Sequence, residues 1–304
     1  MKKALVIGVN QYSPQKPLRG CVNDAKAINS LLREVYSFDE TTLLIDQSVT
    51  KTTILDSLTT LLEPIPNELD GVRVFFFAGH GGRVLDVSGD EVDKIDENLC
   101  MPDYDWSNTS TYILDDDLAR VLEKGAQASP AIRLYVLLDS CHSGTGTRDV
   151  PSTLTWQDID AVSKSILNAS TPAAAGLGSD DPRLSLLCVS RVASDPLEVT
   201  VLLKNADSTL ESKYLSLGFS SINNQPDSHL LLSGCTANQT CKDVPLDGDY
   251  HGIFTYTLTK LARANPAITW SDLQVSIMGI IAEPFNQNPQ LEGASALKAL
   301  PIFS

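Results

Sequence analysis

Two apolar runs, each continuing into a glycine-containing segment, decide the fold. They are residues 72–82 (VRVFFFAGHGG) and residues 133–144 (RLYVLLDSCHSG). Runs that are apolar nearly throughout are typical of strands buried on both faces at the centre of a parallel sheet. Functional residues of open α/β sheets gather just beyond the carboxyl ends of such strands. His80 and Cys141 occupy that position, so we expect them to be neighbours in space.

Outward from these runs, short β-branched segments alternate with longer amphipathic ones. This pattern predicts an α/β fold with a mostly parallel central sheet of about six strands flanked by helices. Further strands are expected at residues 4–9, 42–45 and 229–233, and an edge strand at 297–303. Helices are expected at residues 25–35, 50–62, 115–123, 253–263 and 270–282.

Composition and charge limit the function classes. With 42% hydrophobic and 20% charged residues, the 304-residue chain is typical of a globular protein. Its 23 basic and 38 acidic residues give a net charge of −15. This balance argues against nucleic-acid binding, which needs clustered Lys and Arg. It is compatible with metal cations, with substrates that carry Lys or Arg, or simply with solubility.

The sequence predicts a cytoplasmic protein with no membrane partner. No window approaches the roughly 18 apolar residues of a membrane span. The apolar run after the first three residues is shorter than the roughly 7–15 residues of a signal peptide. The six cysteines are scattered, which favours free thiols over disulfides or a zinc site.

We expect one domain over residues 1–304. Its parts are residues 1–149, which contain both His80 and Cys141, and residues 228–304, where regular patterning resumes. Between them, residues 150–227 mix Ser, Thr, Ala, Gly and Pro, which is typical of an insert or a long linker.

A Cys and a His at adjacent strand ends have the layout of a nucleophilic pair. Taken alone, Cys141 is more typical of a small buried hydrophobe, but the joint occurrence with His80 favours catalysis. His142 is the alternative base, although its side chain would have to fold back across the backbone.

The strings FFFAGHGG and LLDSCHSGTG resemble the catalytic blocks of metacaspases, the caspase-like cysteine proteases that include the prokaryotic orthocaspases. Residues 18–25 (LRGCVNDA), the acidic loop 89–102 and residues 233–255 resemble further blocks of the family, in the same order. The resemblance covers residues 1–149 and 228–291. It implies a caspase-like three-layer fold and a cysteine endopeptidase that acts on proteins.

The resemblance also implies roles. Cys141 would attack the peptide carbonyl, and His80 would be the general base that then protonates the leaving amine. Backbone N–H groups of Gly81 and Cys141 would form the oxyanion hole. Metacaspases often process themselves, and the expected cut follows Arg183, or else Arg191, within the insert.

Specificity for Arg, with Lys second, follows from two carboxylates. In metacaspases the Asp two residues before the Cys and the Asp of the N-D-A block line an acidic pocket, and the matching residues are Asp139 and Asp24. Two carboxylates can hold a guanidinium bidentately. On the residues alone, Asp24 could instead cap the following helix, and Asp139 could be a buried structural hydrogen-bonder.

Calcium is expected from the carboxylate-rich segment that follows residues 72–82, from Asp90 to Asp117. Hard oxygen ligands favour Ca²⁺, although the segment is not an EF-hand loop. The resemblance to calcium-dependent metacaspases points to Asp96, Asp115, Asp116 and Asp149, the last one position farther from the Cys than the pattern has it. A solvated acidic surface is the alternative.

Two other function classes fit these residues less well. A catalytically silent caspase-like scaffold module would be free to lose the residues that are present here. A nucleotide-binding Rossmann domain would need a G-x-G-x-x-G turn after the first strand, and residues 7–10 (IGVN) are not one. The expected partners are therefore protein substrates with Arg or Lys before the scissile bond, and the expected state is a monomer.

Overall fold

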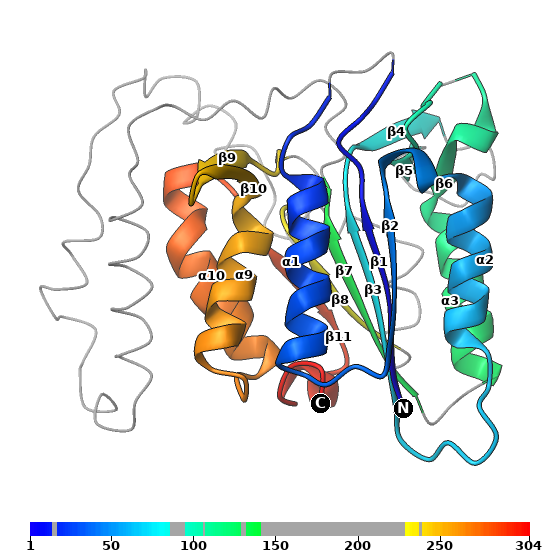
Figure 1. Ribbon diagram of the computed structural model, residues 1–304, viewed down its shortest axis with the longest axis vertical. Coiled ribbons are helices and arrows are strands. Elements are labelled where there is room, and N and C mark those ends of the chain that lie inside the picture. The colour runs from blue at the N-terminus through cyan, green and yellow to red at the C-terminus, as the bar shows by residue number, and fades with distance from the viewer. Residues whose placement is uncertain (14–16, 86–94, 106, 129–131, 141–228, 237–238) are drawn as a thin grey trace, which may run out of the picture.

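A six-stranded sheet crosses the middle of the molecule (Figure 1). The computed structural model describes residues 1–13, 17–85, 95–105, 107–128, 132–140, 229–236 and 239–304. In spatial order the strands are β11 (Gln290–Gly293), β8 (His229–Ser233), β7 (Ile132–Asp139), β3 (Gly71–Ala78), β1 (Lys2–Gly8) and β2 (Glu40–Ile45). All neighbours are parallel except β11, which is antiparallel to β8. The expectation of about six mostly parallel strands is confirmed.

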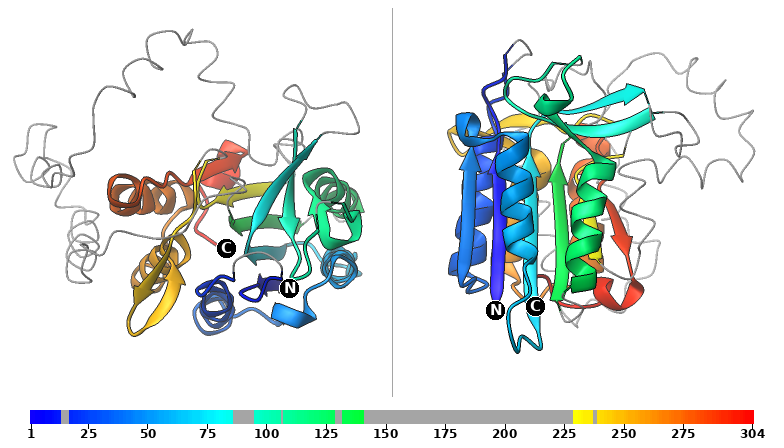
Figure 2. Two further views of the ribbon diagram at one scale, coloured as in Figure 1. Left: turned by 90° about the horizontal axis from the view of Figure 1, so that it is seen from above. Right: turned by 90° about the vertical axis from the view of Figure 1, so that its right-hand side faces the viewer.

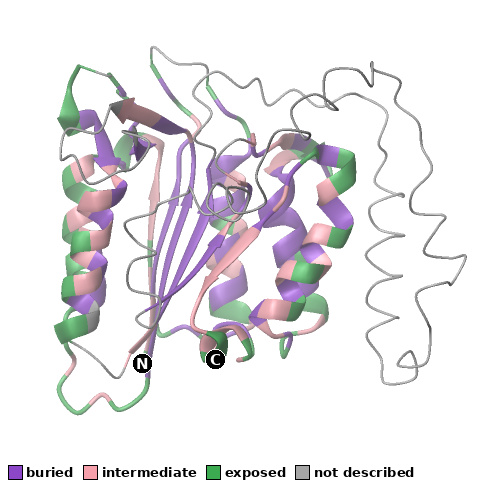
Figure 3. Cartoon of the chain, turned by 180° about the vertical axis from the view of Figure 1, so that it is seen from behind, coloured by how far each residue is buried: buried purple, intermediate pink, exposed green. Residues whose placement is uncertain are grey.

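The centre of the sheet is fully buried (Figure 3). Every residue of β3 is buried, and Phe76 lies in register with Val6 on one side and Leu137 on the other. Apart from Arg73, the side chains of β3 are apolar on both faces because helices cover both faces. The two runs that decide the fold are thus the middle strands of the sheet.

Helices form the outer layers. The helices α1 (Cys21–Glu34), α9 (Ile253–Ala264) and α10 (Trp270–Phe285) lie on one side of the sheet, and α2 (Lys51–Leu62) and α3 (Asp115–Ala128) lie on the other (Figures 1 and 2). Helix α1 shows why, because Ala25, Ile28 and Leu32 recur at three- and four-residue steps and are all fully buried.

Two small β-structures lie at the carboxyl ends of the parallel strands. One is an antiparallel sheet of β4 (Gly81–Leu85), β5 (Ile95–Cys100) and β6 (Tyr112–Leu114); the other is a hairpin of β9 (Asp243–Leu246) and β10 (Asp249–Gly252). The sequence analysis placed all of β5 in a loop. That was wrong because β5 buries Asp96, Glu97 and Asn98, and such polar residues do not read as a buried strand.

The expected edge strand at residues 297–303 was also wrong. The chain there forms the short helix α11 (Ser295–Lys298), and the edge strand is β11. The end of the chain is apolar because Ile302 and Phe303 are buried in the core. Short 3₁₀ helices complete the structure at η1 (Asp46–Ser48) and η2 (Thr109–Thr111).

In the part of the chain that the structure describes, no helix combines the length and apolarity that crossing a bilayer needs. The expected insert, residues 150–227, lies outside the described residues. Four cysteines in the described part of the chain are buried thiols that form no disulfide, as expected: Cys21, Cys100, Cys235 and Cys241.

Candidate active site

The carboxyl ends of β3 and β7 lie side by side, as the sequence predicted. Ala78 is in register with Asp139, and the Gly79 N–H donates to the Asp139 carbonyl at 3.3 Å. His80 therefore follows directly on a strand end that is bonded to the end of β7. Cys141, the expected nucleophile, lies outside the described residues, which stop here at Ser140.

His80 is held by groups on both sides. Its backbone N–H donates to the Tyr12 hydroxyl at 2.8 Å, and its carbonyl accepts from the Cys100 N–H at 3.0 Å. The rings of Tyr12 and His80 pack with centroids 4.5 Å apart. The sequence analysis missed Tyr12, whose one signal was its position just beyond the end of the first strand. Gly81, the expected oxyanion donor, begins β4 opposite Leu99.

Asp24 and Asp139 converge on one backbone position, Gly252. Asp24 Oδ2 accepts from the Gly252 N–H at 2.9 Å, and Asp139 Oδ2 accepts from the Thr255 hydroxyl at 2.6 Å. A Cβ at Gly252 would collide with Asp139 Oδ2 and would lie 2.9 Å from Asp24 Oδ2. Both carboxylates are 1% exposed. The structure thus brings together two acidic residues that are far apart in sequence.

The capping alternative for Asp24 is wrong. The N-cap of α1 is Gly20, and it makes no side-chain cap. Asp24 stands within the first turn, and its carboxylate is directed to β10. Asp139 does make a buried hydrogen bond, so the structural alternative for this residue and a role in a pocket are both compatible with its geometry.

His251 lies beside this acidic pair, and the sequence did not predict its position there. Its Nδ1 lies 3.2 Å from Asp24 Oδ1, and 18% of its side chain is exposed. Burial lowers the pKa of His251, and the nearby charges of Asp249, Asp247 and Asp243 oppose that shift. His251 lies on β10, opposite Val244, and a residue on such a short hairpin strand carries no sequence signal of this contact.

The sequence and the fold of this chain are similar to those of known proteins. A family model described as the metacaspase peptidase C14 domain matches residues 2–151. Metacaspase-1 of Schizosaccharomyces pombe is 28% identical over 95% of this chain and 66% of that protein. Metacaspase-1B of Aspergillus oryzae is 28% identical over 99% of this chain and 70% of that protein. The chain belongs to the metacaspase family.

The chain thus has the peptidase domain of a cysteine-type endopeptidase, and it spans about two thirds of the length of these relatives. Solved structures support the fold. A protein from Geobacter sulfurreducens superposes with a TM-score of 0.60 at 22% identity, covering all of this chain and 98% of the other. The structure of pro-sf-caspase-1 gives 0.51 at 12% identity, covering 99% and 90%. The fold is therefore caspase-like.

The residues expected to bind calcium are placed in part. Asp96 on β5 is 3% exposed, Asp115 at the start of α3 is 1% exposed, and Asp116 is half-buried. Burial first, and then the charge of Asp96, raises the pKa of Tyr112. Within the described ranges these three aspartates do not form a group of three converging ligands. Asp149 lies outside the described residues.

A different trio does converge among the described residues. Ligand atoms of Cys21, Asp24 and Asp243 all lie within 4.8 Å of one another. Asp243 Oδ2, however, accepts from the backbone N–H groups of Arg19 and Gly20 at 3.1 and 3.2 Å. The trio therefore borders the acidic pair and is not assigned as a metal centre.

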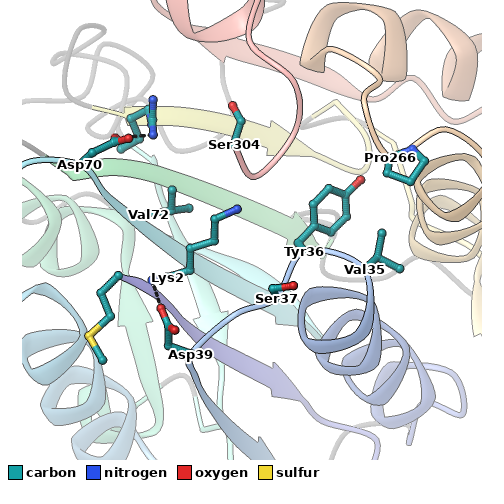
Figure 4. Close-up of a pocket in the computed structure, with 11 residues that line it drawn as sticks. Lys2, Val35, Tyr36, Ser37, Asp39, Asp70, Val72, Pro266 and Ser304 are labelled. Atoms are coloured by element: carbon teal, nitrogen blue, oxygen red, sulfur yellow. Dashed lines mark hydrogen bonds and ion pairs between the residues drawn. The ribbon is translucent and has the colours of Figure 1, made fainter.

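A cavity of about 550 Å³ lies at the amino-terminal ends of the parallel strands, opposite the candidate active site (Figure 4). Its lining includes Lys2, Tyr36, Asp39, Asp70, Val72 and Ser304. Lys2 and Val72 stand at the starts of β1 and β3, whereas His80 follows the end of β3. The cavity is therefore separate from the candidate active site.

Proposed function

We propose that this metacaspase cleaves proteins after Arg, and more slowly after Lys, with Cys141 as nucleophile and His80 as base. The observation that carries the proposal is the convergence of Asp24 and Asp139 on Gly252. This acidic pair lies beside the strand ends that precede both reacting side chains in the sequence.

The acidic pair suits a guanidinium in charge and in shape. Two carboxylates can each accept hydrogen bonds from a planar group with five donors, which Lys cannot offer. Burial strengthens this attraction because water no longer screens it. An aspartate side chain brought to the same place would be repelled, so cleavage after Asp is not expected.

The proposed mechanism assigns each proton. His80 takes the thiol proton of Cys141, the thiolate attacks the peptide carbonyl, and the imidazolium then gives its proton to the leaving amine. N–H groups of Gly81 and Cys141 would stabilise the oxyanion. Tyr12 contributes by holding the backbone of His80.

Hydrolysis of fluorogenic peptides tests the specificity. We expect an Arg peptide to be cut, a Lys peptide more slowly and an Asp peptide not at all, with no activity in Cys141→Ala. Asp24→Asn should lower kcat/KM for the Arg peptide at least tens-fold, since losing one charge of a buried pair costs about 2–5 kcal/mol. Asp103→Asn, an exposed aspartate elsewhere, is the control. Cleavage after Asp, or an unchanged Asp24→Asn, would refute the proposal.

Calcium activation is proposed through Asp96, Asp115, Asp116 and Asp149. The first two fit a hard cation, because they are buried carboxylates from β5 and the neighbouring start of α3. Bound calcium would supply positive charge that draws these carboxylates together. Calorimetry on the Cys141→Ala protein should show Ca²⁺ binding that Asp115→Ala weakens. Full activity in EDTA would reject calcium activation and leave the specificity proposal intact.

Self-processing is proposed after Arg183, or else after Arg191. Both lie outside the described residues, in the turn-prone segment that has no counterpart in the family blocks. Incubation should give two fragments, seen by gel and intact mass and absent in Cys141→Ala. A chain that stays whole while cutting peptides would contradict self-processing alone.

A further inference from the structure

Two buried cysteines, Cys235 and Cys241, lie sulfur to sulfur at the end of β7. Their Sγ atoms are 2.9 Å apart. The Cys241 Sγ lies 3.4 Å and the Cys235 Sγ 3.8 Å from the carbonyl oxygen of Ser140. Ser140 is the residue before Cys141. The thiol pair therefore contacts the peptide group that leads into the proposed nucleophile.

The surrounding backbone holds this pair in place. The Gln287 side chain donates to the Gly234 carbonyl at 2.9 Å. Gln239 Oε1 accepts from the N–H groups of Asn288 and Thr236 at 2.9 and 3.3 Å. The segment that carries both cysteines is thus hydrogen-bonded to the residues that follow α10. The two sulfurs already face each other, so a bond between them needs no large movement of the backbone.

We propose that Cys235 and Cys241 form a reversible disulfide that lowers peptidase activity, with hydrogen peroxide as the oxidant. The Cys235 thiolate attacks one peroxide oxygen, the O–O bond breaks, and a sulfenic acid and the first water form. The Cys241 thiolate then attacks that sulfur, the S–S bond forms, and the second water leaves. Two thiols and one peroxide thus give one disulfide and two waters, so hydrogen and electrons balance. Cys235 reacts first because it is 6% exposed and Cys241 is 0% exposed.

The effect on activity comes from the Ser140 carbonyl and rests on the proposed function. Both thiols can donate S–H hydrogen bonds to this oxygen, and a disulfide has no S–H to donate. The Ser140 carbonyl belongs to the same planar peptide group as the N–H of Cys141. Holding the carbonyl therefore fixes the direction of an N–H that we assign to the oxyanion hole. Oxidation removes that constraint.

The bond itself is tested in the Cys141→Ala protein, where the catalytic thiol cannot interfere. After brief treatment with peroxide and then catalase, the protein is denatured, free thiols are alkylated and the digest is analysed by mass spectrometry. We expect a peptide pair linked through Cys235 and Cys241, and full alkylation once dithiothreitol is added. Cys21 and Cys100, which are also buried thiols outside any disulfide, should be alkylated in every sample. Alkylation of both Cys235 and Cys241 after peroxide, or a link to another cysteine, would overturn the proposal.

The activity effect is tested in the wild-type protein while a reversible arginyl peptide aldehyde occupies Cys141. After peroxide treatment and removal of the aldehyde, kcat for an Arg peptide should be about tenfold lower, because a lost oxyanion donor costs at least that much. Dithiothreitol should restore it. The ratio of oxidised to reduced activity should return to one in Cys235→Ala and stay low in Cys100→Ala. A linked pair with an unchanged ratio would overturn the regulatory role, whereas an inactive reduced enzyme would instead overturn the proposed function.

Discussion

At the scale of single residues, the Tyr12 hydroxyl connects two backbone segments at His80. It accepts from the His80 N–H at 2.8 Å and donates to the Cys100 carbonyl at 3.4 Å. Tyr12 is thus a positioning residue that acts through His80.

Replacing Tyr12 by Phe should lower kcat about fivefold to tenfold, because the hydrogen bond that positions His80, worth about 1 kcal/mol, is lost together with the weaker one to Cys100. KM for an Arg peptide should not change, since the Tyr12 hydroxyl bonds the backbone of His80 and Cys100. Steady-state kinetics separate the two constants. Tyr36→Phe, which removes a buried hydroxyl at the other end of the sheet, is the control. A rise in KM alone would contradict the positioning role.

His229 should make folding sensitive to acid. Burial lowers its pKa to about 4, below the roughly 6.5 of an exposed histidine. Between these values the unfolded chain binds more protons than the folded one, so the free energy of unfolding falls as the pH drops through this window. The loss approaches roughly 3 kcal/mol.

Urea unfolding of wild type and His229→Gln at pH 7 and pH 4 measures this effect. The carboxylates titrate alike in both proteins, so the difference between the two pH dependences reports His229. The variant should lose less stability on acidification. Equal losses would show that His229 is not the group that titrates.

At the scale of elements, helix α2 begins at a complete capping box. Thr50 Oγ1 accepts from the Thr53 N–H at 3.1 Å, and Thr53 Oγ1 accepts from the Thr50 N–H at 2.9 Å. Thr50→Ala should lower the free energy of unfolding by about 1 kcal/mol. Thr52→Ala, an exposed first-turn residue outside the box, should change it by less than half as much. Chemical denaturation measures both variants.

Element type was readable from the sequence where hydrophobic periodicity is strong. The central strands and the five long helices of the described residues were predicted within a few residues, because burial on two faces or one face leaves a clear pattern. Strand β5 was missed because its buried residues are polar, and the last strand was misplaced because buried apolar residues need not be extended.

The candidate site was readable only where it lies in motifs. Asp24 and Asp139 were found because each stands in a family-like block. His251 and Gly252 were not, because they reach Asp24 across more than 220 residues of chain. The hairpin of β9 and β10 supplies this contact. Its short alternating sequence does not specify where the hairpin packs against the rest of the fold.

At the scale of the whole molecule, Phe303 joins the central sheet to the helical layer that contains α1 and α10. Its ring is fully buried and packs against Tyr36 and Trp270 at 5.0 Å between centroids, and against Phe38 and Tyr135 at 6.2 Å. These partners come from segments near the start, the middle and the end of the chain. The Phe303 ring therefore packs these distant segments of the chain together.

Phe303→Ala should lower the free energy of unfolding by about 3–5 kcal/mol, as large-to-small changes in a packed core do. Val275→Ala, at a position that is 66% exposed, should have little effect. Thermal unfolding compares the two variants. A small loss in Phe303→Ala would mean that the aromatic cluster repacks around the gap.

The ladder between β7 and β8 joins residues that flank the segment from 141 to 228. Asp24 and Asp139 come from before that segment, and Gly252 and Thr255 from after it. A break in the segment would therefore leave neither fragment with a full pocket. Activity would then require a heterodimer of the two fragments. It would be undiminished at high protein concentration and lost on extreme dilution of the cleaved protein. Separately produced fragments should also reconstitute one another by complementation.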